Sequence, residues 1–120
     1  TLGLPRPFFI QTLYRYADLA RKEGAFDQAA KLWEKATEYQ EYIACIELAK
    51  YHEHRLRDYA RAMEWTLQAQ ILLESSPQPL YIKKRVLTDL QKRQERLEQK
   101  LRRLVYASRQ SESEEKPHGQ

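Results

Sequence analysis

Apolar residues recur at intervals of three and four over most of this chain, which is the pattern of amphipathic helices. The first such pattern predicts a helix over residues 8–23, and Gly24 follows it as a residue suited to a left-handed helix cap. A second predicted helix covers residues 27–38, with Asp27 as its N-cap or first-turn residue. Helical patterning resumes over residues 42–74.

The chain contains an internal repeat with an offset of 33 residues, which brings the segment 26–36 into line with the segment 59–69. The two segments share an aromatic residue at their first position, Phe26 and Tyr59, and alanines at two later positions. Self-similarity at such a period is typical of stacked helical hairpins. We therefore predict two tandem hairpins, over residues 8–38 and 42–74.

The repeat positions resemble those of tetratricopeptide repeats, in which small residues let paired helices approach and large ones fill the remaining holes. The matching positions are Gly24, Phe26, Ala29, Trp33 and Ala36 in the first copy and Tyr59, Ala62, Thr66 and Ala69 in the second. The second copy departs from the pattern, because its turn contains about one extra helical turn around residues 53–57 and no glycine. Residues 47–59 instead resemble the longer turn of Sel1-like repeats.

Residues 10–105 as a whole are similar to the repeat region at the C-terminus of bacterial proteins that begin with a ribonuclease-H-like exonuclease domain. The resemblance implies a parent nuclease whose divalent metal and catalytic acids belong to that other domain, which nothing in this sequence resembles. This region would then add a protein-binding or substrate-guiding surface. Since the sequence opens at Thr1 without a methionine, we expect it to be the C-terminal piece of a longer protein.

The run Ser75-Ser76-Pro77-Gln78-Pro79 interrupts the helical pattern, and one long helix is predicted after it, over residues 80–107. Leucines at seven-residue intervals give this helix an apolar seam, interrupted at Gln94. Residues 1–7, with two prolines, are predicted to be a linker, and the polar residues 108–120 a disordered tail. The predicted fold is all-α: two tetratricopeptide-like hairpins capped by a long C-terminal helix.

Composition excludes several classes of protein. With 120 residues the chain is expected to form one domain, and its three glycines are too few for a glycine-rich phosphate loop. A single cysteine excludes an internal disulfide and a cysteine-based zinc site, which favours a reducing, cytoplasmic location. No apolar stretch is long enough to span a membrane. The net charge of +4 resides in one segment, because residues 80–107 alone carry +6.

Candidates for chemistry are few, and each has a structural explanation. His52 and His54 lie about 200° apart on a helix and cannot share a metal ion there. Cys45 lies in an apolar run and is predicted to be buried rather than nucleophilic. We therefore predict that this chain alone is not an enzyme and holds no metal or cofactor.

Mapping the repeat positions onto the helices places a set of polar and aromatic residues on the concave face of the stack. They are Tyr14, Asp18 and Arg21 in the first hairpin and Glu47, Tyr51 and His54 in the second. In tetratricopeptide-like proteins this face often receives an extended peptide or a helix of a partner. The occupant would be a partner protein or the parent's own N-terminal domain, and the alternative is a solvated face without an occupant.

The basic helix admits three explanations. Its seam could simply cover the last hairpin, with the charges keeping it hydrated. Its cations could instead bind phosphates of a nucleic acid, through Lys83, Lys84, Arg85, Lys92, Arg93, Arg96, Lys100 and Arg103. Its leucines could also join two copies of the chain into a homodimer, which Leu97→Lys would disrupt. The function predicted first is a non-catalytic interaction or scaffold module, with nucleic-acid binding and homodimerisation as alternatives.

Overall fold

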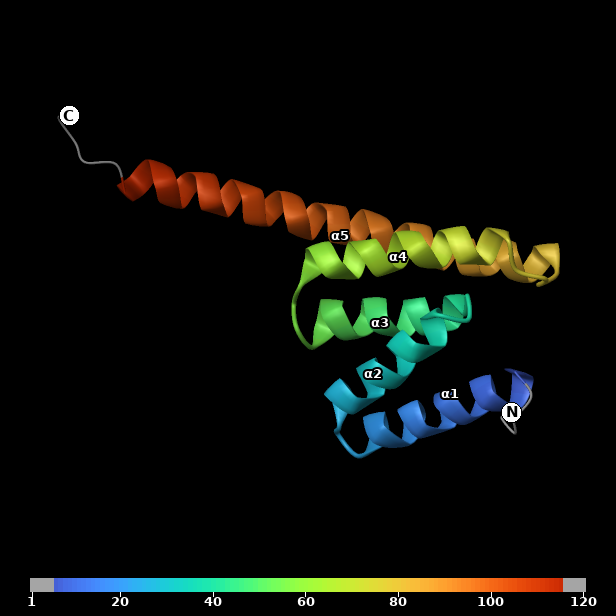
Figure 1. The fold of residues 1–120 in the computed structure, drawn as a ribbon. Helices are drawn as coiled ribbons and strands as arrows, with labels where there is room; N and C mark the ends of the chain where they lie inside the picture. Colours follow the sequence, from blue (N-terminus) through green and yellow to red (C-terminus); the bar gives the residue numbers. More distant parts are fainter. Residues whose placement is uncertain (1–5, 116–120) are drawn as a thin grey trace.

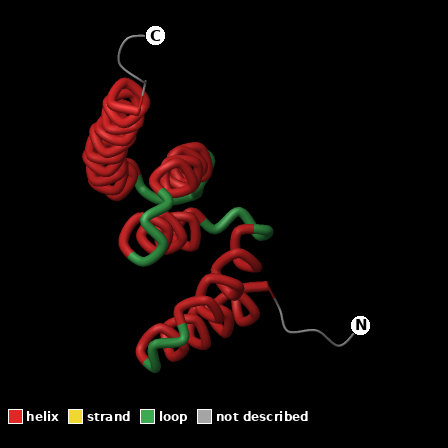
Figure 2. Tube along the Cα trace, turned by 90° about the vertical axis from the view of Figure 1, so that its left-hand side faces the viewer, coloured by secondary structure: helices red, strands yellow, loops and turns green. Residues whose placement is uncertain are grey.

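A computed structural model describes residues 6–115, and over this range the chain forms five helices and no strand. In chain order these are α1 (Arg6–Lys22), α2 (Phe26–Thr37), α3 (Tyr42–His54), α4 (Tyr59–Glu74) and α5 (Leu80–Glu115). Each helix packs against the next along the chain, so α1/α2 and α3/α4 form hairpins and α5 covers α4 (Figures 1 and 2). The predicted all-α fold, with two hairpins capped by a long helix, is confirmed.

The two hairpin turns have different geometry, as their sequences predict. Gly24 adopts a φ of +82°, and the N–H of Ala25 closes the turn by donating to the carbonyl of Ala20 at 2.8 Å. The second turn has no glycine, so Arg57 takes the left-handed conformation with a φ of +53°. Asp58 then caps α4 by accepting a hydrogen bond from the N–H of Arg61 at 3.1 Å.

The centre of the stack consists largely of alanine. The repeat positions Ala29, Ala36, Ala62 and Ala69 are all fully buried, as are Ala17, Ala44 and Ala49. Because a methyl group fills little space, neighbouring helices come close together, and Trp33 fills the remaining volume between them with only 5% of its surface exposed. These positions confirm the packing expected from the repeat.

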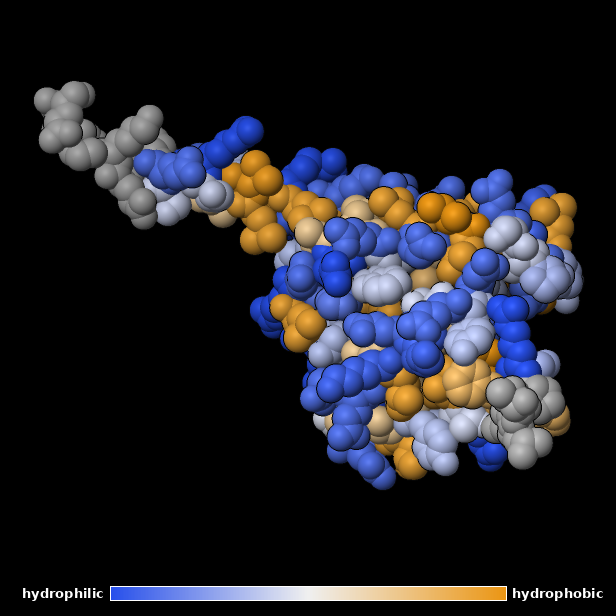
Figure 3. Space-filling view, in the orientation of Figure 1, coloured by the Kyte–Doolittle hydropathy of each residue, from blue (hydrophilic) through white to orange (hydrophobic). Residues whose placement is uncertain are grey.

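The leucine seam of α5 is divided between two environments. Leu90 and Leu97 are 2% and 0% exposed, and Leu90 packs with Ala69 and Leu73 of α4. Leu104, seven residues further along, is 53% exposed. The difference follows from length, since α5 has 36 residues and α4 only 16, and its C-terminal part projects past the hairpins (Figure 1). Apolar atoms are exposed along this projecting part (Figure 3).

Both ends of the helical region extend beyond the predicted limits. α1 begins at Arg6 and includes Pro7, which was assigned to the linker 1–7; a first helical turn tolerates proline because its N–H would have no partner there. α5 continues to Glu115 instead of ending at residue 107, since neither glycine nor proline intervenes before that point. The rest of the predicted linker and tail, residues 1–5 and 116–120, lies outside the described residues.

The described residues also bear on membrane insertion. None of the five helices combines enough length with enough apolar character to cross a bilayer.

Candidate functional site

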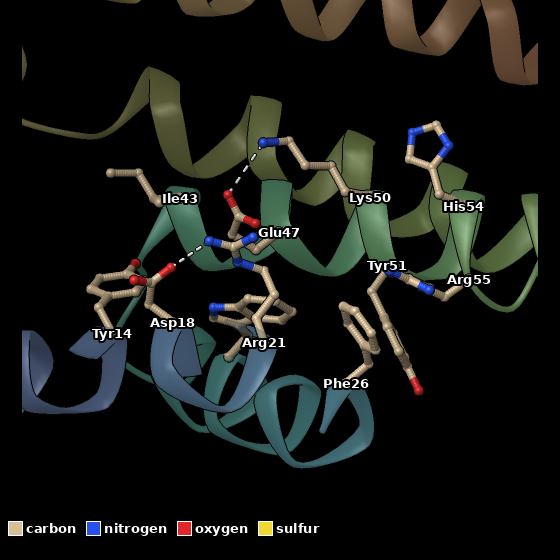
Figure 4. A pocket seen from close by; sticks show the side chains of 11 residues that line it. Tyr14, Asp18, Arg21, Phe26, Ile43, Glu47, Lys50, Tyr51, His54 and Arg55 are labelled. Atoms are coloured by element: carbon tan, nitrogen blue, oxygen red, sulfur yellow. Dashed lines mark hydrogen bonds and ion pairs between the residues drawn. The ribbon is translucent and has the colours of Figure 1, made fainter. Parts of the chain in front are cut away.

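A groove of about 510 Å³ lies between the first hairpin and α3. All six residues predicted to occupy the concave face line it: Tyr14, Asp18 and Arg21 from α1, and Glu47, Tyr51 and His54 from α3. Their spacing of three and four residues places each set on one side of its helix. Figure 4 shows Asp18 and Arg21 of α1 next to Glu47 of α3, whereas the His54 ring points away from α1. The groove also contains Phe26, Trp33, Ile43, Lys50 and Arg55, which sequence analysis did not assign to this face.

The hydroxyl of Tyr14 joins α1 to the start of α3. It accepts a hydrogen bond from the N–H of Ala44 at 3.2 Å, which gives a partner to one of the backbone donors that a helix N-terminus leaves unpaired. Burial, together with the nearby Glu41 carboxylate, raises the pKa of Tyr14 far above its usual value. The Tyr14 hydroxyl therefore links α1 to α3 at the wall of the groove.

Charged side chains of both signs line the middle of the groove (Figure 4). Arg21 donates to Asp18 at 2.6 Å on α1, and Lys50 donates to Glu47 at 3.3 Å on α3. Hydrogen bonds from Arg21 and Lys22 lower the pKa of Asp18, and the bond to Asp18 raises the pKa of Arg21. Both pairs are solvent-accessible, so exchanging them for a ligand's charges costs little free energy.

The C-terminal end of α3 gives one end of the groove an aromatic and cationic character. The guanidinium of Arg55 lies 3.6 Å from the centroid of the Phe26 ring, which is a cation–π contact. His54, with a side chain 58% exposed, also lines the groove and has its Nε2 3.7 Å from the Glu53 carboxylate, and Tyr51 contributes a second ring to the same end. This end can therefore receive an acidic or aromatic group, while Trp33 forms part of the apolar lining.

The candidates for catalytic or metal chemistry lie apart from one another. Cys45 is fully buried, as predicted, and burial raises the pKa of its thiol to about 11, so the thiolate is scarce at neutral pH. His52 is 9% exposed and His54 is 58% exposed, which agrees with their placement on different sides of α3. Over the described part of the chain, no three His, Cys, Asp or Glu side chains are grouped as metal ligands.

The buried carboxylate of Glu53 was not among the residues predicted from the sequence. Its side chain has no exposed surface, and it accepts hydrogen bonds from three cations of α5. Arg96 donates through Nε and Nη2 at 2.7 and 2.9 Å, Lys100 donates through Nζ at 2.7 Å, and Arg93 donates through Nη1. Burial alone would raise the pKa of Glu53, but the bonds from Arg96 and Lys100 prevail and lower it to about 2.

Glu53 changes the assignment of the eight cations predicted as a nucleic-acid surface. Arg93, Arg96 and Lys100 bind Glu53 and hold α5 against α3, so they do not form a surface directed only at phosphates. Lys83 also has a partner, since it donates to the carbonyl of Glu74 at 2.8 Å. The other four, Lys84, Arg85, Lys92 and Arg103, are exposed. The sequence did contain one signal. Arg93, Arg96 and Lys100 are spaced by three and four residues and so share one side of α5, and Glu53 follows the buried Ala49 by four residues and so shares its side of α3.

No protein-family model matches the chain, and no solved structure matches it. The chain is similar to the uncharacterized protein YprB of Bacillus subtilis (strain 168), with 33% identity over 73 residues. The aligned part is 54% of this chain and 18% of YprB, so the match covers less than a fifth of that relative.

Proposed function

We propose that this region is a non-catalytic protein-interaction module of the cytoplasm, and that the groove between the first hairpin and α3 receives an extended segment of a partner protein. The observation that carries the proposal is the composition of the groove: aromatic and apolar residues lie together with charges of both signs around a volume of about 510 Å³. Sites that recognise peptides combine an apolar contact surface with a few polar groups that set orientation.

The geometry favours a segment with an apolar or aromatic side chain next to an acidic one. The apolar residue would pack on the exposed Ile43, next to the edge of the buried Trp33, and the acidic residue would lie at the end that contains His54 and Arg55. Because the groove residues belong to packed helices, the main chain of the groove loses little conformational entropy when a ligand binds.

The resemblance to the repeat region of ribonuclease-H-like exonuclease-domain proteins supports a particular setting for this module. In a longer protein of that kind, the groove would hold a partner or the nuclease domain itself, and the divalent metal would belong to the nuclease domain. Turnover would then require a domain that this sequence does not resemble.

The proposal can be tested by selecting peptides from a random dodecamer phage library on the purified chain. Selected peptides would be titrated against the wild type and against a groove variant that changes two exposed lining residues, Lys50→Glu with Ile43→Ala. The matched control changes two exposed residues elsewhere on α1, Arg15→Glu and Tyr16→Ala. We expect the groove variant to lose at least 10-fold in affinity and the control to change by less than 2-fold. Equal losses in both variants, or a library that yields no binding peptide, would overturn the proposal.

A further inference from the structure

The exposed cations of α5 are not distributed evenly around the helix. At 100° per residue, Arg85, Lys92, Arg96 and Arg103 lie within a sector of about 40°, because they are separated by seven, four and seven residues. At 1.5 Å per residue, this row of cations extends over about 27 Å. We call these four residues the α5 ridge.

The ridge is accessible to a ligand. Arg85, Lys92 and Arg103 are exposed, and within the described residues none of them lies within ion-pair distance of a carboxylate. Arg96 binds Glu53, yet its side chain remains 43% exposed. One acid, the exposed Asp89, lies beside the ridge, and the surface keeps a clear positive excess.

Two exposed tyrosines lie near the ends of the ridge. Tyr81 and Tyr106 are 72% and 66% exposed, and both lie within about 60° of the ridge on the helix surface. Gln110 donates to the hydroxyl of Tyr106 at 2.8 Å and so orients that ring. Exposed rings next to a row of cations are the combination that binds single-stranded nucleic acids, because cations contact phosphates and bases stack on the rings.

We propose that the α5 ridge binds the phosphate backbone of a nucleic acid without sequence preference, with Tyr81 and Tyr106 stacking on bases. A straight row of cations on a rigid helix fits a regularly charged strand better than a folded protein surface, which would need a matching row of acids. The C-terminal part of α5 projects from the body (Figure 1), and Arg103 and Tyr106 are exposed, so a strand can reach them. This surface is distinct from the groove, and neither function depends on the other.

The measurement is fluorescence anisotropy with a labelled 20-nucleotide single strand, a 20-base-pair duplex and labelled heparin, at several salt concentrations. Neutralising about four phosphates predicts a slope of log K against log salt of about −3 for the single strand. Stacking predicts stronger binding to the single strand than to the duplex and heparin. Equal binding to heparin and to the oligonucleotides would show a general attraction for polyanions and would overturn the proposal.

The α5 ridge has a closely matched control. The ridge variant carries Arg85→Glu, Lys92→Glu and Arg103→Glu, and the control carries Lys31→Glu, Lys84→Glu and Arg102→Glu. All six residues are exposed, both variants change net charge equally, and Lys84 and Arg102 lie about 100° around α5 from the ridge. We expect at least a 30-fold loss in the ridge variant, with a slope near −1, and less than a 3-fold loss in the control. Equal losses would overturn the proposal.

A third variant of the ridge distinguishes an effect on binding from an effect on folding. The triple change to glutamine at Arg85, Lys92 and Arg103 removes the charges without reversing them, and helix content and thermal unfolding would be recorded together with binding.

The stacking part of the proposal is tested at the two tyrosines. Changing Tyr81 and Tyr106 to alanine should reduce single-strand binding about 10-fold and leave duplex binding nearly unchanged. Unchanged single-strand binding in the alanine variant would remove the stacking part of the proposal.

Discussion

The two junctions of the helix stack are held together by different chemistry. Where the first hairpin meets α3, alanines and Trp33 pack closely, and the nearby ion pairs of Asp18 and Glu47 are solvent-accessible. Where α3 and α4 meet α5, Leu73 and Leu90 supply much of the apolar contact, but a buried carboxylate with three cationic partners lies between α3 and α5. The repeat pattern accounts for the first junction and does not account for the second.

This difference indicates that, at the end of the stack, one group of residues supplies the apolar contact and another fixes the position of α5 along α4. Apolar contact is not directional, and a seam of leucines at regular intervals would tolerate a shift of α5 along α4. The bidentate hydrogen bond from Arg96 to Glu53 has a fixed geometry, which such a shift would break. We therefore expect Glu53 to select one position of α5, while burial of Leu90 and Leu97 supplies most of the favourable free energy.

The largest expected effect comes from removing the buried carboxylate. Glu53→Ala leaves Arg93, Arg96 and Lys100 without their shared partner, and we expect the free energy of unfolding to fall by about 4 kcal/mol. Denaturant unfolding would measure the loss. Glu47→Ala, which removes an accessible pair on the same helix, should cost less than about 1 kcal/mol. Similar losses for the two variants would mean that Glu53 acts as an ordinary surface charge.

The leucine seam offers the next comparison, because two leucines seven residues apart have opposite environments. Leu97→Ala creates a cavity at a fully buried position and should lower the free energy of unfolding by about 3 kcal/mol. Leu104→Ala changes an exposed side chain and should alter it by less than about 0.5 kcal/mol. Sedimentation of the Leu104 variant tests the homodimer alternative as well, since a dimer joined through the projecting part of α5 would dissociate.

Acid should weaken the α3–α5 junction selectively. The pKa of Glu53 is about 2 in the folded chain and lies near 4.5 for an ordinary glutamate, so its stabilising effect is complete above about pH 4.5 and disappears as the pH falls toward 2. The difference in unfolding free energy between the wild type and Glu53→Gln should therefore narrow over this range. Parallel unfolding series at several pH values would reveal it, and a constant difference would contradict the assignment.

The smallest expected effects concern the two hairpin turns. Gly24→Ala places a side chain at a φ of +82° and should lower the free energy of unfolding by about 1 kcal/mol, although the added methyl group would meet no neighbouring atom. Arg57→Gly should act in the opposite direction and raise it by up to about 1 kcal/mol, because it relieves a φ of +53°. Thermal unfolding would compare the variants, and equal signs would show that backbone conformation does not control these turns.

Much of the architecture was predictable from local features. The hairpins are identified by apolar residues spaced by three and four, by Gly24 and by the alanines at repeat positions. Each of these signals acts within one helix or between helices adjacent in the chain. The concave residues Tyr14, Asp18 and Arg21 followed from the same repeat positions, and the structure places them in the groove. The role of Arg55 over Phe26 did not follow, because the longer second turn displaces that residue from the repeat pattern.

By itself the sequence determined the helices, the hairpins and the small residues at their contacts, because these depend on neighbours three, four or about 33 positions away. Only the tertiary structure decided which charges are exposed and which are buried. Glu53 is indistinguishable from a surface glutamate until α5, 40 to 47 residues further along the chain, brings its cations to it. A charge can be buried when hydrogen-bonding partners of opposite charge replace its water, and only folding brings those partners to it.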